Sequence, residues 1–227
     1  MTTVPYRIRR SQRARVARIL IDGDAVEVVV PSRFPLREVE PFVREKSAWI
    51  ERTLRRQREA HAEFPPARVE PGGFVPYLGE RLGLHVDLEP GRVRAHVRRT
   101  AGELRVTLGD PADLSSAVEA WYRRRARAEI EPRLDAAVER DGASYERLQI
   151  RAQRTRWASC SSNGTMSFNQ RLLLAPPEIL EYVIDHEVAH LEVLDHSRRF
   201  WALLGSRCPD WRRHEEWLRR HGHSLRL

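Results

Sequence analysis

Residues 176–196 read P-P-E-I-L-E-Y-V-I-D-H-E-V-A-H-L-E-V-L-D-H. The segment contains an H-E-x-x-H pattern, from His186 to His190, and a third histidine, His196, follows six residues later. Two histidines four residues apart project from one face of a helix and can bind one metal ion. Three protein ligands leave one coordination position open, which is typical of a catalytic zinc site rather than a structural one.

A helical wheel predicts how this segment packs. At about 100° per residue, His186 and His190 lie at one border of an apolar arc, and the arc is formed by Leu180, Val183, Ile184, Val188, Leu191 and Leu194. Glu187 falls inside the arc, where an unpaired carboxylate is costly, so a neighbouring cation is its simplest partner. Asp185 and Glu192 fall on the side expected to face water, which makes them weak candidates for orienting a ligand imidazole.

The pattern predicts one zinc ion per chain, bound by His186, His190 and His196. Composition alone would produce the H-E-x-x-H triplet in about one chain of this length in a hundred. The third histidine and the buried position of Glu187 make the metal-site interpretation the stronger one. Imidazole ligands with an open position suit zinc, although Mn, Co or Ni could occupy the same ligands.

The chemistry expected of such a site is hydrolysis. Zinc lowers the pKa of a bound water toward about 7, and Glu187 would take its proton as general base and deliver it to the leaving amine as general acid. A protein or peptide substrate is therefore expected. Hydrolysis of a non-peptide amide is an alternative.

The spacing of the three histidines matches H-E-x-x-H-x-x-G-x-x-H, but Val193 occupies the glycine position. Without that glycine a sharp left-handed turn is unfavourable, so the helix is expected to run to about Leu194. His196 would then lie at the junction with the next helix, with Asp195 or Ser197 as its N-cap.

The chain has two cysteines, which favours a reducing compartment and a cytoplasmic location over a disulfide framework. Cys160 could be a fourth zinc ligand or a nucleophile, and a small buried thiol is the more common alternative. No apolar run approaches the roughly 18 residues needed to span a bilayer, and no secretory signal is recognised at the N-terminus. Neither a membrane association nor an oligomeric state is indicated.

The chain is strongly basic, with a formal net charge of +8 and 40 Lys and Arg residues among 227. Lys46 is the single lysine. Such a balance suits contact with nucleic acid or acidic protein, but the arginines are spread along the whole chain, which weakens the case for one dedicated patch. A nucleic-acid-associated protein, either a protease acting on DNA-bound proteins or a basic binding module with a vestigial metal site, is the alternative hypothesis.

Hydrophobic periodicity predicts an α+β protein with a strand-rich N-terminal region at residues 1–110 and a helical catalytic half at residues 111–227. Long helices are expected over Pro35–Ala60 and Ala112–Arg140, and an Asn163-Gly164 turn signal precedes a strand. Further strands are expected over 14–21, 26–30, 77–88, 93–97, 103–108, 148–150, 155–161 and 165–169, and closing helices over 197–204 and 210–221.

Several of these segments resemble the YgjP-like metallopeptidase family, which is related to the SprT-like and WLM zincins. The similar segments are Arg156–Ser161, Tyr182–Leu191, Asp195–Ser197, Phe200-Trp201 and Cys208–Asp210. The family usually has glycine at the position of Ala158 and asparagine at that of Asp195. The resemblance implies a zincin-type metallopeptidase, with His186, His190 and His196 as ligands and Glu187 as catalyst. It implies no defined physiological substrate.

Overall fold

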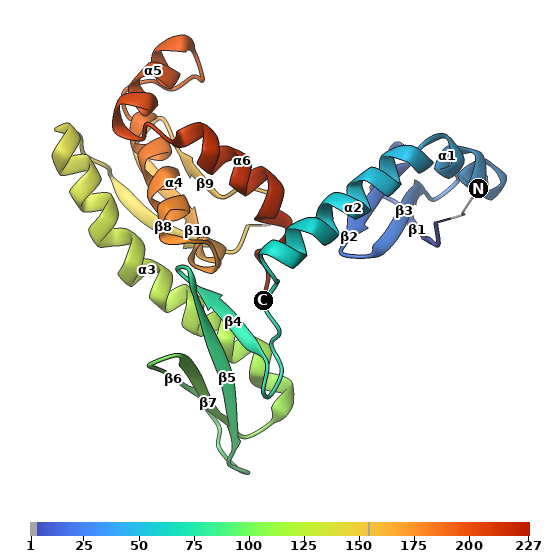
Figure 1. Ribbon diagram of the computed structural model, residues 1–227, viewed down its shortest axis with the longest axis horizontal. Coiled ribbons are helices and arrows are strands. Elements are labelled where there is room, and N and C mark those ends of the chain that lie inside the picture. Colours follow the sequence, from blue (N-terminus) through green and yellow to red (C-terminus); the bar gives the residue numbers. More distant parts are fainter. Residues whose placement is uncertain (1–3, 154) are drawn as a thin grey trace. The chain divides into compact units, whose positions relative to one another are not determined.

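The computed structural model describes residues 4–153 and 155–227, and it confirms the mixed α+β class (Figure 1). The chain forms two compact units, residues 1–65 and residues 66–227. The predicted division at residue 110 falls inside the second unit, between a strand and a helix, and as a functional division it stays a prediction. Within the described residues, no helix combines the length and apolarity needed to cross a membrane.

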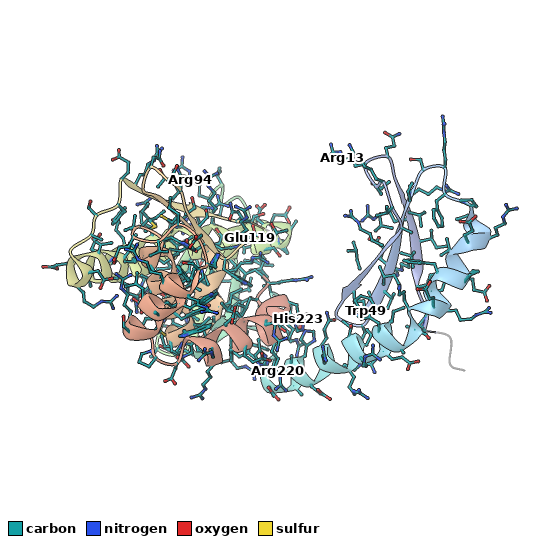
Figure 2. The ribbon with its side chains drawn as sticks, turned by 90° about the horizontal axis from the view of Figure 1, so that it is seen from above. Arg13, Trp49, Arg94, Glu119, Arg220 and His223 are labelled. Carbon is teal, nitrogen blue, oxygen red and sulfur yellow. The ribbon has the colours of Figure 1, made fainter. Side chains whose placement is uncertain are left out.

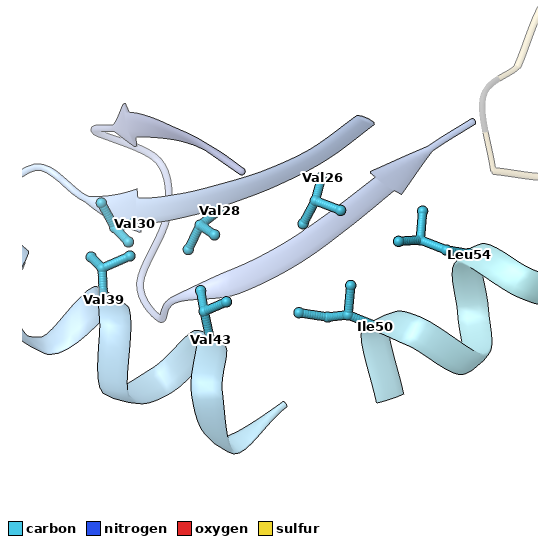
Figure 3. Packing of buried hydrophobic residues seen from close by; sticks show 7 residues of the cluster. All are labelled: Val26, Val28, Val30, Val39, Val43, Ile50 and Leu54. Carbon is cyan, nitrogen blue, oxygen red and sulfur yellow. The ribbon is translucent and has the colours of Figure 1, made fainter. Parts of the chain in front are cut away.

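The first unit packs two helices on one face of a three-stranded sheet. The strands are β1 (Arg7–Ser11), β2 (Arg18–Asp22) and β3 (Ala25–Pro31), in the order β1-β3-β2. Strand β1 is parallel to β3, and β2 and β3 form an antiparallel hairpin within the two segments predicted as strands. Alternate residues of β3 reach the helices and form the core shown in Figure 3, which comprises Val26, Val28, Val30, Val39, Val43, Ile50 and Leu54.

The helix predicted over Pro35–Ala60 is divided in the structure. A short 3-10 helix (Leu36–Glu38) leads into α1 (Val39–Glu45), and α2 (Ser47–Glu63) begins after Lys46, whose backbone leaves the helical region. The break lets the apolar residues of both helices face the same sheet. Periodicity along the sequence could not reveal this change of direction between the two helices.

The second unit begins with a four-stranded sheet. Its strands are β4 (Phe74–Tyr77), β5 (Glu80–Leu88), β6 (His96–Thr100) and β7 (Glu103–Leu108), in the order β4-β5-β7-β6. The predicted strand 77–88 is β5 with three residues too many at its start, because Tyr77 ends β4, and Leu78 and Gly79, both with positive φ, form a tight turn. Strand β4 was not predicted. The predicted strand 103–108 is confirmed with its bounds as β7.

Helix α3 (Leu114–Asp141) is the longest element. It packs against β6 and β7 of this sheet and against β8 (Arg147–Arg151) of a second sheet. A 3-10 turn (Pro111–Asp113) precedes it, in which the Asp110 carboxylate accepts a 2.8 Å hydrogen bond from the amide of Ala112. Gly142 ends the helix in the left-handed region, at a φ of 64°. The helix predicted over Ala112–Arg140 is therefore confirmed to within two residues.

The remaining elements form the part of the unit that holds the three histidines. A second sheet has the order β8-β10-β9, with β8 (Arg147–Arg151), β9 (Ala158–Cys160) and β10 (Thr165–Asn169). A 3-10 segment (Gln170–Leu174) leads to α4 (Pro177–Ala189), and α5 (Arg198–Arg207), α6 (Trp211–His221) and a last 3-10 turn (Gly222–Ser224) follow. Helix α4 contacts β9, α3, α5 and α6, so it lies at the centre of this region (Figure 1).

Candidate metal centre

Helix α4 positions the first two histidines. Pro177 occupies its first turn, where a missing amide proton costs nothing. The apolar residues predicted for the buried arc are buried as expected, with the exceptions of Leu191 and Leu194, which follow the end of the helix. The rings of His186 and His190 lie one turn apart, with centroids 5.0 Å from each other.

The helix ends at Ala189, five residues earlier than predicted. His190 is its C-cap residue, and the backbone then tightens into a turn in which the amide of Val193 donates to the carbonyl of Ala189 at 3.0 Å. The expectation of a helix to Leu194 was wrong, because Leu194 is exposed and brings no packing energy to a further turn. The early end redirects the chain toward the face of α4 that carries the histidines.

His196 completes the group from the loop before α5. Its Nε2 lies 3.1 Å from Nε2 of His186, and the nitrogens of the three imidazoles that could bind a metal all lie within 4.8 Å of one another. Of the two residues predicted as possible N-caps of α5, Asp195 and Ser197, the structure has Ser197. The amide of Ser197 donates to the Asp195 carboxylate at 3.1 Å. Residues from one helix and the loop that follows it therefore converge on one point.

One further contact fixes the orientation of His190. Its Nδ1 lies 3.0 Å from the carbonyl oxygen of Val193 and can donate to it. That hydrogen bond sets the tautomer with Nε2 unprotonated. The ring therefore has a free lone pair toward the other two histidines.

Helix α5 supplies an aromatic wall behind the imidazoles. Phe200 is fully buried and stacks on His190 with a 4.5 Å separation of ring centroids. Trp201 lies against His196 at 5.6 Å and stacks on Trp211 of α6 at 4.4 Å. Burial here, together with the neighbouring imidazoles, lowers the pKa of His186 to about 3, so the ring is neutral at physiological pH.

Glu187 is buried, as the wheel predicted, with 6% of its surface exposed. Burial raises the pKa of its carboxyl to about 7, and a backbone hydrogen bond from Cys160 of β9 partly opposes that rise. Its Oε2 has no hydrogen-bond partner among the described residues, and neither has the buried Nδ1 of His186. A carboxylate that titrates near neutrality beside three convergent imidazoles is an arrangement typical of an acid–base group.

Neither cysteine belongs to the group of three imidazoles. Cys160 is half-buried, and burial together with the charge of Glu187 raises the pKa of its thiol to about 11, which disfavours a nucleophilic role. Cys208 lies 3.5 Å from Nδ1 of His214, and burial raises the pKa of this thiol as well. The structure is therefore consistent with small, protonated thiols.

The expectation that Asp185 faces water was wrong. Only 13% of its side chain is exposed, and its carboxylate accepts a 2.8 Å hydrogen bond from Arg140 near the end of α3. Arg207 of α5 binds both Asp141 and Glu192. These ion pairs join α3, α4 and α5, and a helical wheel cannot show them because all the partners are distant in sequence.

Sequence reasoning gave no role to the two residues that enclose the imidazoles, Phe200 and Trp201. One signal was available for Phe200. It lies four residues after His196, and residues at that spacing share a face wherever the chain is helical. The contact with His190, however, depends on the turn after Ala189 and could not be read from spacing.

The sequence is similar to that of a known family of metallopeptidases. A sequence model described as YgjP-like, metallopeptidase domain, matches residues 15–221. Among solved structures, the chain is similar to the crystal structure of the metallopeptidase zymogen of Pyrococcus abyssi abylysin, with 27% sequence identity and a TM-score of 0.36. That similarity covers 40% of this chain and 90% of the other. No curated protein sequence matches the chain.

Proposed function

This chain belongs to the YgjP-like metallopeptidase family, and we propose that it hydrolyses peptide bonds with one zinc ion held by His186, His190 and His196. Glu187 is the general base and general acid. The observation that carries the proposal is the convergence of three imidazoles beside a buried carboxylate oxygen that has no partner among the described residues.

The residues fit zinc. A tetrahedral ion with bonds of about 2.0–2.1 Å to nitrogen requires ligand nitrogens separated by about 3.3 Å, and Nε2 of His186 and Nε2 of His196 lie 3.1 Å apart. The depressed pKa of His186 keeps its lone pair available, and the Val193 carbonyl leaves Nε2 of His190 free. Imidazole nitrogen favours zinc over harder cations such as Mg²⁺.

A bound zinc ion supplies Lewis acidity, which makes water acidic and polarises a carbonyl. The chain supplies the movement of protons. Glu187 accepts a proton from the attacking water and donates it to the amine as the carbon–nitrogen bond breaks. Burial keeps the Glu187 carboxylate weakly solvated, which makes it a stronger base than an exposed glutamate.

The two free cysteines suit a reducing compartment, and we propose a cytoplasmic location on that ground. The substrates are then intracellular proteins or peptides. The family membership supports this class of substrate but does not select a member of it.

The test compares the wild-type protein with Glu187→Gln, a substitution that keeps the shape and removes the base. We expect both proteins to bind one equivalent of zinc, measured by elemental analysis after dialysis, and only the wild type to cleave β-casein. Equal cleavage by both proteins would overturn the role of Glu187. Absence of stoichiometric metal from the wild type would overturn the zinc site itself.

A further inference from the structure

The first unit has an apolar groove on its surface. It encloses about 310 Å³ and is lined by Ile19 of β2, Phe42 of α1, Lys46 and Trp49. Trp49 is 44% exposed, an unusual exposure for the largest apolar side chain. Figure 2 shows Trp49 beside the helices of this unit, away from Arg13 in the loop between β1 and β2. The groove therefore lies between strand β2 and the helical layer.

Strand β2 is an edge strand. In the part of the chain that the structure describes, it pairs with β3 alone. The two-residue turn Gly23-Asp24 makes Asp22 and Ala25 a hydrogen-bonded pair, and such pairs alternate along an antiparallel ladder. Ile19 and Ile21 consequently direct their backbone amides and carbonyls away from β3. No hydrogen bond within residues 4–153 and 155–227 occupies these outward groups, so the outer edge of β2 offers two residues that can pair with another strand.

Ile19 connects these two features. Its backbone lies on the open edge, and its side chain lines the groove. An extended polypeptide meets both requirements, because its backbone alternates donors with acceptors while every second side chain points to the same face. A strand added beside β2 would place an apolar side chain next to Trp49 and Phe42.

The net positive charge of the first unit favours binding of an acidic polypeptide. Residues 1–65 contain 14 Lys and Arg residues but 9 Asp and Glu residues. Exposed Arg18 begins β2, and Lys46, whose Nζ also pairs with Glu45 at 2.7 Å, lies on the groove. An acidic chain is therefore attracted and a basic one repelled.

We infer that the β2 edge and this groove form a docking site for an extended, acidic, apolar-anchored segment of polypeptide, which joins the sheet as a fourth strand. The inference rests on the proposed function in one respect, namely that the docked polypeptide is a substrate. It assigns to the first unit the recruitment of unfolded protein.

Binding is measured first, on the Glu187→Gln background, so that no hydrolysis interferes. The probe is fluorescein-labelled α-lactalbumin that has been reduced and carboxymethylated, which keeps it unfolded and acidic. We expect Trp49→Ala to raise the Kd about tenfold, as loss of an aromatic anchor commonly does. The matched control is Leu20→Ala, because Leu20 lies on the same strand with 41% exposure and faces the other side of the sheet.

A second variant keeps the inference testable if Trp49→Ala proves unstable in a thermal melt. Lys46→Glu reverses a charge at the groove on an exposed side chain. It should weaken binding of the acidic probe at low salt, and the difference should vanish at 1 M salt, where the Debye length is about 3 Å. Equal binding by the parent, Trp49→Ala and Lys46→Glu proteins would overturn the docking site.

Kinetics separate this inference from the proposed function. With Glu187 intact, the ratio of KM for the unfolded protein to KM for an eight-residue peptide should rise about tenfold in Trp49→Ala and not in Leu20→Ala. Altered binding without any hydrolysis would contradict the peptidase proposal and leave the docking site standing. Hydrolysis with an unchanged ratio would overturn the docking site alone, as would loss of single-stranded DNA binding rather than polypeptide binding in Trp49→Ala.

Discussion

Asp185 and Glu187 are carboxylates two residues apart on helix α4, and their surroundings are opposite. Asp185 faces α3, where Arg140 binds it at 2.8 Å. Glu187 faces β9 and the imidazoles, where its Oε2 has no partner among the described residues. One side of the helix thus holds charges that neutralise each other. The other side holds buried polar atoms without a partner among the described residues.

This difference distinguishes carboxylates that stabilise the fold from a carboxylate that is available for chemistry. Buried polar groups in native proteins are nearly always paired, so an unpaired one requires an explanation. On the side facing α3 and α5, Asp185, Asp141 and Glu192 are bound by arginines, and the interaction fixes helix positions. On the other side, the metal ion that we propose accounts for the unpaired atoms, and four measurements test this difference between the two sides.

The largest effect is expected on activity. Glu187→Gln should lower kcat/KM for a peptide by about 10²–10⁴-fold, because the general base is lost. Asp185→Asn, an equally conservative change two residues away, should leave most of the activity, because its partner is Arg140 rather than the substrate. Equal losses in the two variants would show that both carboxylates act through stability of the fold.

The next largest effect is expected on stability, at the ion pairs of Arg207. The Arg207 side chain is 8% exposed and binds Asp141, whose side chain is 7% exposed. Arg207→Met should therefore lower the free energy of unfolding by about 1–3 kcal/mol, measured by urea titration, because the buried Asp141 carboxylate loses one of its two arginine partners and keeps only Arg140. Glu187→Gln should cause no such loss in the metal-free protein, and a similar loss there would contradict the comparison.

Zinc should stabilise the folded protein only when His186, His190 and His196 are all present. Zinc at 100 times its Kd should add about 2.7 kcal/mol to the free energy of unfolding. His196→Ala removes an exposed ligand with little effect on packing, so this variant should gain much less. Thermal melts with zinc and with a chelator make the comparison, and Asp185→Asn is the control that should gain as much as the wild type.

The smallest effect is a pH dependence of the metal-free protein. The pKa of Glu187 is raised from 4.5 to about 7 on folding, so between these values the folded state holds more protons than the unfolded state. The contribution of Glu187 to stability must then fall as pH rises through this window, by at most about 1.4 kcal/mol per pH unit.

The opposite trend from His186, whose pKa is lowered to about 3, is shared by the wild type and Glu187→Gln. It therefore largely cancels when the two proteins are compared. The difference in unfolding free energy between them, measured in urea with a chelator at pH 5, 6 and 7, should shift steadily against the wild type. A difference that stays constant with pH would show that Glu187 has a partner in solution.

Features set by neighbouring residues could be predicted from the sequence, and features set by distant residues could not. The strands β7 and β10 were predicted with their bounds, since alternation and a glycine turn are local signals. Burial of Glu187 was predicted because one helical turn specifies a face. The end of α4 at Ala189 and the break at Lys46 were missed, because packing against other elements decides where each helix stops.

Spacing along one helix was enough to name His186, Glu187 and His190 as a chemical unit, since residues four apart share a face whatever surrounds them. Only the tertiary structure brought Nε2 of His196 to 3.1 Å from His186, placed Phe200 against His190 and gave Asp185 an arginine. The physical reason is the separation in sequence of the residues that interact. Helical periodicity is a property of neighbours in sequence, whereas a ligand set and an ion pair are formed by segments that meet only when the core closes.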